Sequence, residues 1–243
     1  MKIGIIITGF NCEKYVERCI ESCLNQTVKP HSIMVWNDAS TDETENVLDK
    51  YVDNPLVEIH NAETNTGALY GRWIFTQNTD CDVVGFLGMD DQLTPDCVET
   101  LVDVYSNLDI QMTYGNWIDE QNGWVFDVKP YARDVWENRS FRTASWRATA
   151  LNTFKTELLQ MVPVDVLKDS NGVFFKNCTD LAYSFPCLEM VRPHECFVVS
   201  KPLYIYNRSH SNTTLNRLGR ADKTRVREIL KRIPKMEKQW TTR

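Results

Sequence analysis

The first half of the chain alternates short apolar runs with amphipathic segments, and this order constrains the fold more than any other feature. The expected strands are residues 2–8, 32–37, 56–61, 82–89 and 111–117. Segments with helical spacing separate them, at residues 13–26, 40–52, 68–77 and 94–106. A regular succession of strand and helix predicts an α/β fold with a mostly parallel sheet and helices on both faces.

Two of these helices carry start signals. Ser40 and Glu43 have the spacing of a capping box, in which each side chain satisfies a backbone N–H of the first turn. Thr94 precedes Pro95, which predicts a capping hydroxyl followed by proline at the first helical position.

The second half of the chain is less regular. The segments expected there are a loop over residues 117–147, a helix over 149–162, a helix over 178–191 that Pro186 breaks, and short strands over 196–200 and 203–207. Tryptophans of this half are expected mainly in the core, with stacking on a sugar face as the alternative; they are Trp117, Trp124, Trp136 and Trp146.

Composition is that of a globular protein, with 42% hydrophobic and 25% charged residues over 243 residues. The apolar runs are too short to span a bilayer, and the first residues lack the pattern of a signal peptide. The eight cysteines form no C-x-x-C pair. We therefore expect a cytoplasmic protein whose cysteines are reduced and packed in the core.

Charge is distributed unevenly along the chain. Residues 208–243 carry a net charge of +8, which leaves −14 on residues 1–207. The acidic body argues against a nucleic-acid partner. Residues 222–240 predict a basic amphipathic helix that either contacts an anionic membrane surface peripherally or packs on the body. Pro234 interrupts its apolar stripe and favours packing on the body.

Polar residues follow the first four predicted strands. Because ligands of parallel sheets bind beyond the carboxyl ends of the strands, we expect these residues to meet in one pocket. Two adjacent carboxylates repel each other unless a cation lies opposite, so Asp90 and Asp91 predict a divalent metal that also binds a diphosphate. The residues at the strand ends are Thr8, Gly9 and Asn11, then Asp38, then Asn65 and Gly67, then Asp90 and Asp91.

The ordered set of motifs resembles the family 2 glycosyltransferases. The stretch "TGFNCEKYVERCIESCLNQTVKPHSIMVWNDASTDET" and the stretch "NTGALYGRWIFTQNTDCDVVGFLGMDDQLTPD" carry the resemblance, which covers residues 1–207. It implies the GT-A fold, with a Rossmann-like sheet. It further implies a nucleotide-binding half over residues 1–116, an acceptor-binding half over 117–207, and a lid loop and basic helix over 208–243.

The resemblance also implies a role for individual residues. Those implied to bind a nucleotide sugar, commonly a UDP-sugar, are Thr8, Gly9, Asn11, Asp38, Asn65, Gly67, Arg72 and Asp90. Those implied to hold Mn²⁺ or Mg²⁺ are Asp90, Asp91 and His210. Asp180 matches the general base of an inverting transfer to a hydroxyl of a glycan or other acceptor. For each residue a purely structural role, as a helix cap or a solvated side chain, is the alternative.

The sequence departs from the family pattern at three positions. Asn37 and Gly88 stand where aspartates are usual, and Thr179 replaces the glutamate before the base. Two other functions are weighed against sugar transfer. A sugar-phosphate nucleotidyltransferase would need a glycine-rich basic loop after the first strand, which "TGFNCEKY" lacks. A nucleotide-sugar-binding module without transfer activity is the other alternative. Separately, the basic end of the chain is compatible with its being part of a longer polypeptide.

Overall fold

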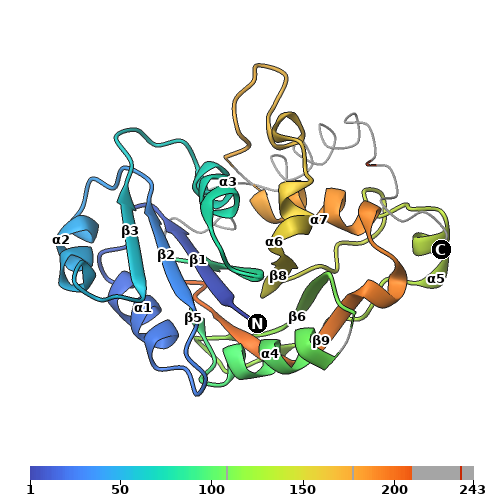
Figure 1. Cartoon of the computed structure of the whole chain (residues 1–243), viewed down its shortest axis with the longest axis horizontal. Coiled ribbons are helices and arrows are strands. Elements are labelled where there is room, and N and C mark those ends of the chain that lie inside the picture. The colour runs from blue at the N-terminus through green and yellow to red at the C-terminus, as the bar shows by residue number, and fades with distance from the viewer. Residues whose placement is uncertain (108, 177, 210–235, 237–243) are drawn as a thin grey trace.

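The computed structural model describes residues 1–107, 109–176, 178–209 and 236. One sheet of nine strands, counted over these residues, runs through the molecule between two layers of helices (Figure 1). In sheet order its strands are β3 (Val57–Asn61), β2 (Ser32–Asn37), β1 (Ile3–Gly9), β4 (Val83–Gly88), β8 (Asn152–Lys155), β6 (Met112–Asp119), β9 (Cys196–Tyr206) and β5 (Gln92–Leu93), with β7 (Val125–Phe126) paired to β6.

The helices separate into two layers, one on each face of the sheet (Figure 1). One layer contains α1 (Val16–Leu24), α2 (Thr44–Leu48), the 3-10 helix η1 (Asp49–Tyr51) and α4 (Cys97–Asn107). The other contains α3 (Ala68–Asn78), α6 (Thr156–Gln160), η2 (Val164–Leu167) and α7 (Thr179–Met190), and the peripheral helices are α5 (Arg133–Glu137) and η3 (Pro193–Glu195).

The sheet is parallel where the sequence pattern is most regular. Strands β3, β2, β1 and β4 pair in parallel, and so do β6 and β9. Strand β1 shows why: Ile5, Ile6 and Ile7 are all fully buried, and side chains of a strand alternate between its faces. A strand that is apolar on both faces is stable only when helices cover both, so β1 lies near the middle of the sheet.

The predicted helix over residues 149–162 is wrong in its first part. Residues Asn152–Lys155 form strand β8, and the helix is limited to Thr156–Gln160. Strand β8 runs antiparallel between β4 and β6, so these two strands are not neighbours in the sheet. Phe154 and Thr153 are fully buried there, so burial between two strands outweighs the local helical spacing.

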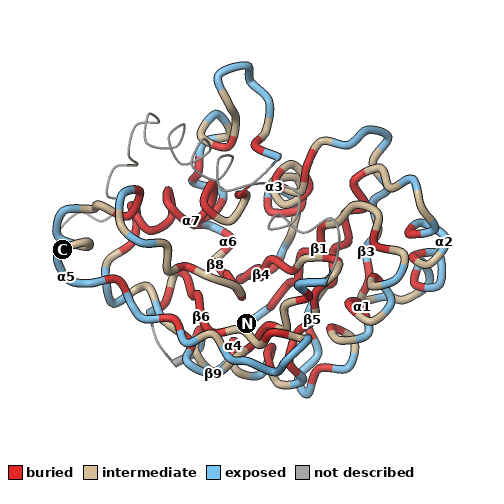
Figure 2. The backbone as a smooth tube through the Cα atoms, turned by 180° about the vertical axis from the view of Figure 1, so that it is seen from behind, coloured by how far each residue is buried: buried red, intermediate tan, exposed pale blue. Residues whose placement is uncertain are grey.

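Two further predictions in the second half are corrected. Pro186 does not break its helix, because α7 runs from Thr179 to Met190 with the proline inside. Residues 181–190 are all buried (Figure 2), and this packing offsets the roughly 3 kcal/mol that an interior proline costs. The two short strands expected near the end are one strand, β9, with a register shift opposite Gly115 and Trp117.

The helix start signals were also wrong in detail. Helix α2 begins at Thr44 without a side-chain cap, and the Ser40 hydroxyl accepts the Asn11 N–H at 2.9 Å instead. Helix α4 begins at Cys97, and the Thr94 hydroxyl donates to the Pro202 carbonyl. The prediction for the cysteines is confirmed, since all eight are free and all but Cys196 are buried. No helix among the described residues is both long and apolar enough to cross a membrane.

Candidate active site

The carboxyl ends of β1, β2, β4, β6 and β9 meet at one edge of the sheet, because these strands all run in the same direction. Thr8 of β1 lies beside Trp36 of β2 and Gly88 of β4 in the register. The polar residues that the sequence placed after these strands therefore share this edge, as expected.

Asp38 fixes the turn that leads into α3. Its buried carboxylate accepts the backbone N–H groups of Thr66 at 2.9 Å and Gly67 at 2.8 Å, and the Trp36 indole N–H at 3.2 Å. The Asn65 side chain donates to the Asp38 carbonyl at 3.0 Å. Gly67 has φ +89°, which favours glycine. Asp38 thus orients the start of α3, whether or not it also contacts a ligand.

Asn11 links the loops that follow β1 and β2. Its side-chain oxygen accepts the Thr41 N–H at 2.8 Å, and its own N–H donates to Ser40. Asn11 has φ 56°, a left-handed conformation that asparagine tolerates better than most residues. The two loops are therefore held as one rim of the edge.

Asp91 is anchored by the last strand of the sheet. One carboxylate oxygen accepts the Asn207 N–H at 2.7 Å, and the other accepts the Tyr204 hydroxyl. Burial, and then the neighbouring Asp90, raise the pKa of Asp91 well above its ordinary value. A Cβ at Gly88 would lie 2.6 Å from the Asp91 carboxylate. An aspartate at position 88, which is usual in the family, would therefore clash with the Asp91 carboxylate as it is placed here, whereas glycine leaves room for it.

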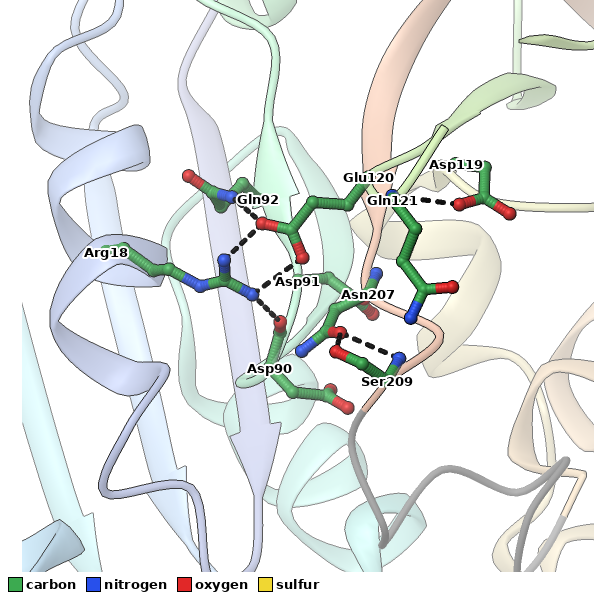
Figure 3. A network of polar contacts seen from close by, with 9 residues as sticks. All are labelled: Arg18, Asp90, Asp91, Gln92, Asp119, Glu120, Gln121, Asn207 and Ser209. Carbon is green, nitrogen blue, oxygen red and sulfur yellow. Dashed lines mark hydrogen bonds and ion pairs between the residues drawn. The ribbon is translucent and has the colours of Figure 1, made fainter. Parts of the chain in front are cut away.

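A charged network that the sequence did not predict surrounds Asp90 (Figure 3). The Arg18 guanidinium of α1 forms an ion pair with Glu120 and donates to the Asp90 carbonyl at 3.2 Å. Gln92 donates to the same Glu120 carboxylate at 3.1 Å. Arg18 and Glu120 are far apart in sequence, so no local motif could have paired them. The network fixes the backbone at Asp90 between α1 and the end of β6.

Arg72 reaches from α3 to the start of α7. Its guanidinium is buried, donates to the Thr179 hydroxyl at 2.8 Å, and lies 5.0 Å from the Phe86 ring centre. Burial lowers the pKa of Arg72, while the nearby Tyr204, Asp180 and Asp91 act in the opposite direction. Arg72 and Asp180, separated by more than a hundred residues, are thus brought together as the motifs implied.

Several buried polar atoms at this edge have no partner within the part of the chain that the structure describes. A buried polar atom without a hydrogen bond is unusual and marks a place where a ligand or water is expected. These atoms are Thr8 Oγ1, Arg72 Nε, Tyr183 Oη and Asn207 Nδ2. Tyr183 and Asn207 were not predicted from the sequence. Tyr183 lies close in sequence to the predicted Asp180, and Asn207 lies close in sequence to the predicted His210.

Glu189, at the other end of α7, is a structural residue. Its carboxylate is fully buried and binds Arg142 through two bonds, Nε to Oε1 at 2.7 Å and Nη2 to Oε2 at 2.8 Å. It also accepts the Met236 N–H at 2.9 Å, and Arg139 donates to the Glu189 carbonyl. A carboxylate held in this way is not placed to act as a general base.

Other predicted features lie outside the described residues. They are His210, most of the expected lid over 207–220, and all of the expected basic helix except Met236. Over the described ranges, no group of three or more His, Cys, Asp and Glu side chains is placed to hold a metal ion.

A family model for glycosyl transferase family 2 matches residues 4–163, which is more than half of the chain. The chain belongs to glycosyl transferase family 2. The match covers nearly all of residues 1–116 and ends before α7, so Arg72, Asp90 and Asp91 fall inside it and Asp180 falls outside. The resemblance drawn from the strand-end motifs is confirmed.

Curated relatives of this glycosyltransferase include two bacterial synthases. The chain is 38% identical over 98 residues to the chondroitin synthase of Pasteurella multocida, covering 40% of this chain and 10% of the synthase. It is 28% identical over 202 residues to the chondroitin synthase of Escherichia coli, covering 75% of this chain and 28% of the synthase. The chain thus spans only a small part of the length of these relatives.

Solved structures confirm the GT-A type fold of this family 2 member. S. aureus TarS 1–349 in complex with UDP superposes with a TM-score of 0.62 at 18% identity, covering 86% of this chain and 61% of that TarS fragment. Glucosyl-3-phosphoglycerate synthase from Mycobacterium tuberculosis, in complex with UDP, gives 0.63 at 16% identity, covering 95% and 79%. The expected α/β class with a mostly parallel sheet is therefore confirmed.

Proposed function

We propose that this chain transfers a sugar from a UDP-sugar to a hydroxyl group of a glycan or other acceptor, with inversion at the anomeric carbon. One observation carries the proposal: the buried Arg72 guanidinium, with its Nε unpartnered among the described residues, lies beside Thr179, Asp180 and Asp91. A buried cation without a carboxylate partner is costly unless an anion binds there. A nucleoside diphosphate supplies that anion, and two structural neighbours are complexes with UDP.

The donor set at the sheet edge fits a weakly held divalent cation. Both oxygens of Asp91 already accept protein hydrogen bonds, so Asp90 is the carboxylate we assign to the metal, with Asp91 adding negative charge beside it. Mg²⁺ typically keeps several waters and binds one or two carboxylates together with substrate phosphates. Mn²⁺ or Mg²⁺ would neutralise charge on the leaving diphosphate. His210, which lies outside the described residues, stays a predicted further ligand.

Asp180 is the proposed general base. Its carboxylate accepts the proton of the acceptor hydroxyl as that oxygen forms a bond to the anomeric carbon. The bond from this carbon to the UDP oxygen breaks on the opposite face, so UDP leaves with the electron pair and the configuration inverts. Arg72 contacts the diphosphate in this scheme, and Thr8 and Asn207 offer further polar atoms to the donor.

A thermal-shift screen of UDP, GDP, ADP and UDP-sugars, with and without Mn²⁺, tests donor binding. A ligand at a hundred times its Kd stabilises the native state by about 2.7 kcal/mol, which is readily seen. We expect UDP to be the best nucleotide and Mn²⁺ to increase its effect. Asp90→Asn should remove the Mn²⁺-dependent part, whereas Asp96→Asn, whose side chain pairs with Lys201 away from this edge, should not.

The same screen, joined to activity assays, separates the alternatives. A binding module would give the shift but neither hydrolyse the donor nor transfer its sugar. A nucleotidyltransferase would release pyrophosphate from a nucleoside triphosphate and a sugar phosphate. A membrane contact through residues 222–240 stays a prediction, and so does the alternative that this segment packs on the body. Of this segment the structure describes only Met236, whose backbone bonds to Glu189 and Arg139.

A further inference from the structure

Four aromatic side chains form a continuous surface at the ends of β6, β7 and β9. The Trp117 ring lies 5.3 Å from Tyr206 in a T-shaped contact and 5.3 Å from Phe126 in a stacked one, measured between ring centres. Trp124 stands edge-on to both Trp117, at 5.9 Å, and Phe126, at 5.7 Å. We call Tyr206, Trp117, Phe126 and Trp124 the aromatic strip.

The inner end of the aromatic strip borders the candidate active site. Tyr206 pairs with Asp119 in the register of β6 and β9. Burial, and then Asp91, Asp90 and Asp180, raise the pKa of Tyr206, so its hydroxyl lies within the field of all three carboxylates. Figure 3 shows Glu120, the residue that follows β6, joined through Arg18 to the Asp90 carbonyl. The aromatic strip therefore starts next to the candidate active site and runs outward.

The outer end of the aromatic strip is exposed. Trp124 is 53% exposed, and Trp117, Phe126 and Tyr206 are only partly buried. Aromatic rings in the core of the same half, such as Tyr114 and Phe141, are fully covered. An exposed set of large rings next to a catalytic edge indicates a binding surface, since folding alone does not require it.

Two ion pairs follow these rings at the end of β6. The buried Asp119 pairs with the exposed Arg208 at 3.1 Å, and the partly exposed Glu120 pairs with Arg18. A pyranose ring presents apolar C–H groups on its faces and hydroxyls at its rim, and it matches an aromatic surface that has polar side chains such as Glu120 and Arg208 at its edge. A nucleic acid matches it poorly, because its phosphates would approach the Glu120 carboxylate.

We propose that the aromatic strip is the acceptor subsite and that its ligand is a glycan of several sugars. The terminal sugar presents its hydroxyl between Tyr206 and Asp180, and the following sugars stack on Trp117 and Trp124. This inference rests on the proposed function and adds a substrate class to it: an oligosaccharide binds more strongly than a monosaccharide because it covers more of the aromatic strip.

Acceptor length dependence tests the inference. The full chain is assayed with chondroitin and hyaluronan oligosaccharides of two, four and six sugars, in transfer assays with UDP-sugars and in binding assays without donor, by saturation-transfer NMR. We expect the hexasaccharide to bind about tenfold more strongly than the disaccharide, which corresponds to about 1.4 kcal/mol. Trp124→Ala should remove this preference, and Trp124→Tyr, which keeps a ring, should retain most of it.

Phe197→Ala is the matched control. Phe197 is 37% exposed and lies near the start of β9, away from the carboxyl edge, so its removal should leave the length preference intact. The inference is overturned if Trp124→Ala and Phe197→Ala behave alike, if no oligosaccharide binds, or if Trp124→Ala changes the oligomeric state instead of glycan binding. Glycan binding that depends on Trp124 without any UDP-sugar turnover would support the aromatic strip and overturn the proposed function.

Discussion

The two halves of this glycosyltransferase place their functional groups by different means. In residues 1–116 each strand ends in a short polar motif, and the parallel sheet aligns those motifs at one edge. In residues 117–209 the functional groups lie on a buried helix and one long strand, and they reach the same edge only through contacts with the first half, such as Arg72 with Thr179 and Tyr204 with Asp91.

This difference predicts that substitutions in the two halves have different effects. The half formed by residues 1–116 depends on local turns, such as the one that Asp38 fixes through Thr66 and Gly67. The half formed by residues 117–209 depends on pairings between distant residues, such as Arg142 with Glu189. We therefore expect changes in the first half to affect mainly donor binding, and changes in the second to affect catalysis or folding.

The largest effect is expected at Asp180. Asp180→Asn should lower kcat by about 10²–10⁴-fold, the usual contribution of a general base, and leave UDP affinity within a few-fold. Steady-state kinetics and thermal shift measure the two quantities. Asp165→Asn, an exposed acidic residue on η2, is the control. Transfer that persists in Asp180→Asn would move the base to another carboxylate and break the assignment of catalysis to α7.

Breaking the buried Arg142–Glu189 pair should strongly destabilise the acceptor-side half. Glu189→Gln or Arg142→Met should lower the free energy of unfolding by about 3–5 kcal/mol, because one charge is left buried without a partner. Denaturant unfolding measures it. Arg133→Met removes the exposed Arg133–Glu137 pair and should cost less than about 1 kcal/mol. Equal effects of the two changes would contradict a structural role for Glu189.

Arg72 should show opposite effects on stability and on donor binding. Arg72→Met should weaken UDP binding by about 1.5–3 kcal/mol, the contribution of a hydrogen bond to a charged group. The unliganded protein should be as stable or more stable, since methionine removes a buried charge that is held by the Thr179 hydroxyl, the Phe86 ring and the field of nearby carboxylates, and not by an ion pair among the described residues. Isothermal titration calorimetry measures the expected loss of UDP affinity, and thermal unfolding measures the expected unchanged or increased stability. A loss of stability with unchanged UDP affinity would show that Arg72 only joins α3 to α7.

The smallest expected effect is the pH dependence of stability that comes from Asp91, in residues 1–116. The pKa of Asp91 is raised in the folded state, so its contribution to stability is present at low pH and is lost as pH rises through that folded pKa. The metal-free protein should therefore lose stability as pH rises from about 4, the ordinary pKa of an aspartate, toward the raised pKa of Asp91. Melting temperatures across this range should depend less on pH in Asp91→Asn, whereas an unchanged profile would show that other groups dominate.

The sequence by itself determined the parallel core, the strand-end residues and the family. Residues 3–7 are apolar at every position but the glycine, and a strand of that kind has few alternatives to the centre of a covered sheet. The turn motifs after each strand are local, so the order of residues along the chain is enough to place Asn11, Asp38, Gly67 and Asp90 at the edge.

Only the tertiary structure decided the second half. The helical spacing of residues 149–162 did not reveal that β8 inserts between β4 and β6, because the neighbours of a strand are set by long-range pairing. Nor did any local pattern indicate Arg18 with Glu120, Asp91 with Asn207, or Pro186 inside a buried helix. In each case the deciding energy is burial or a hydrogen bond between segments distant in the chain, which a local pattern does not record.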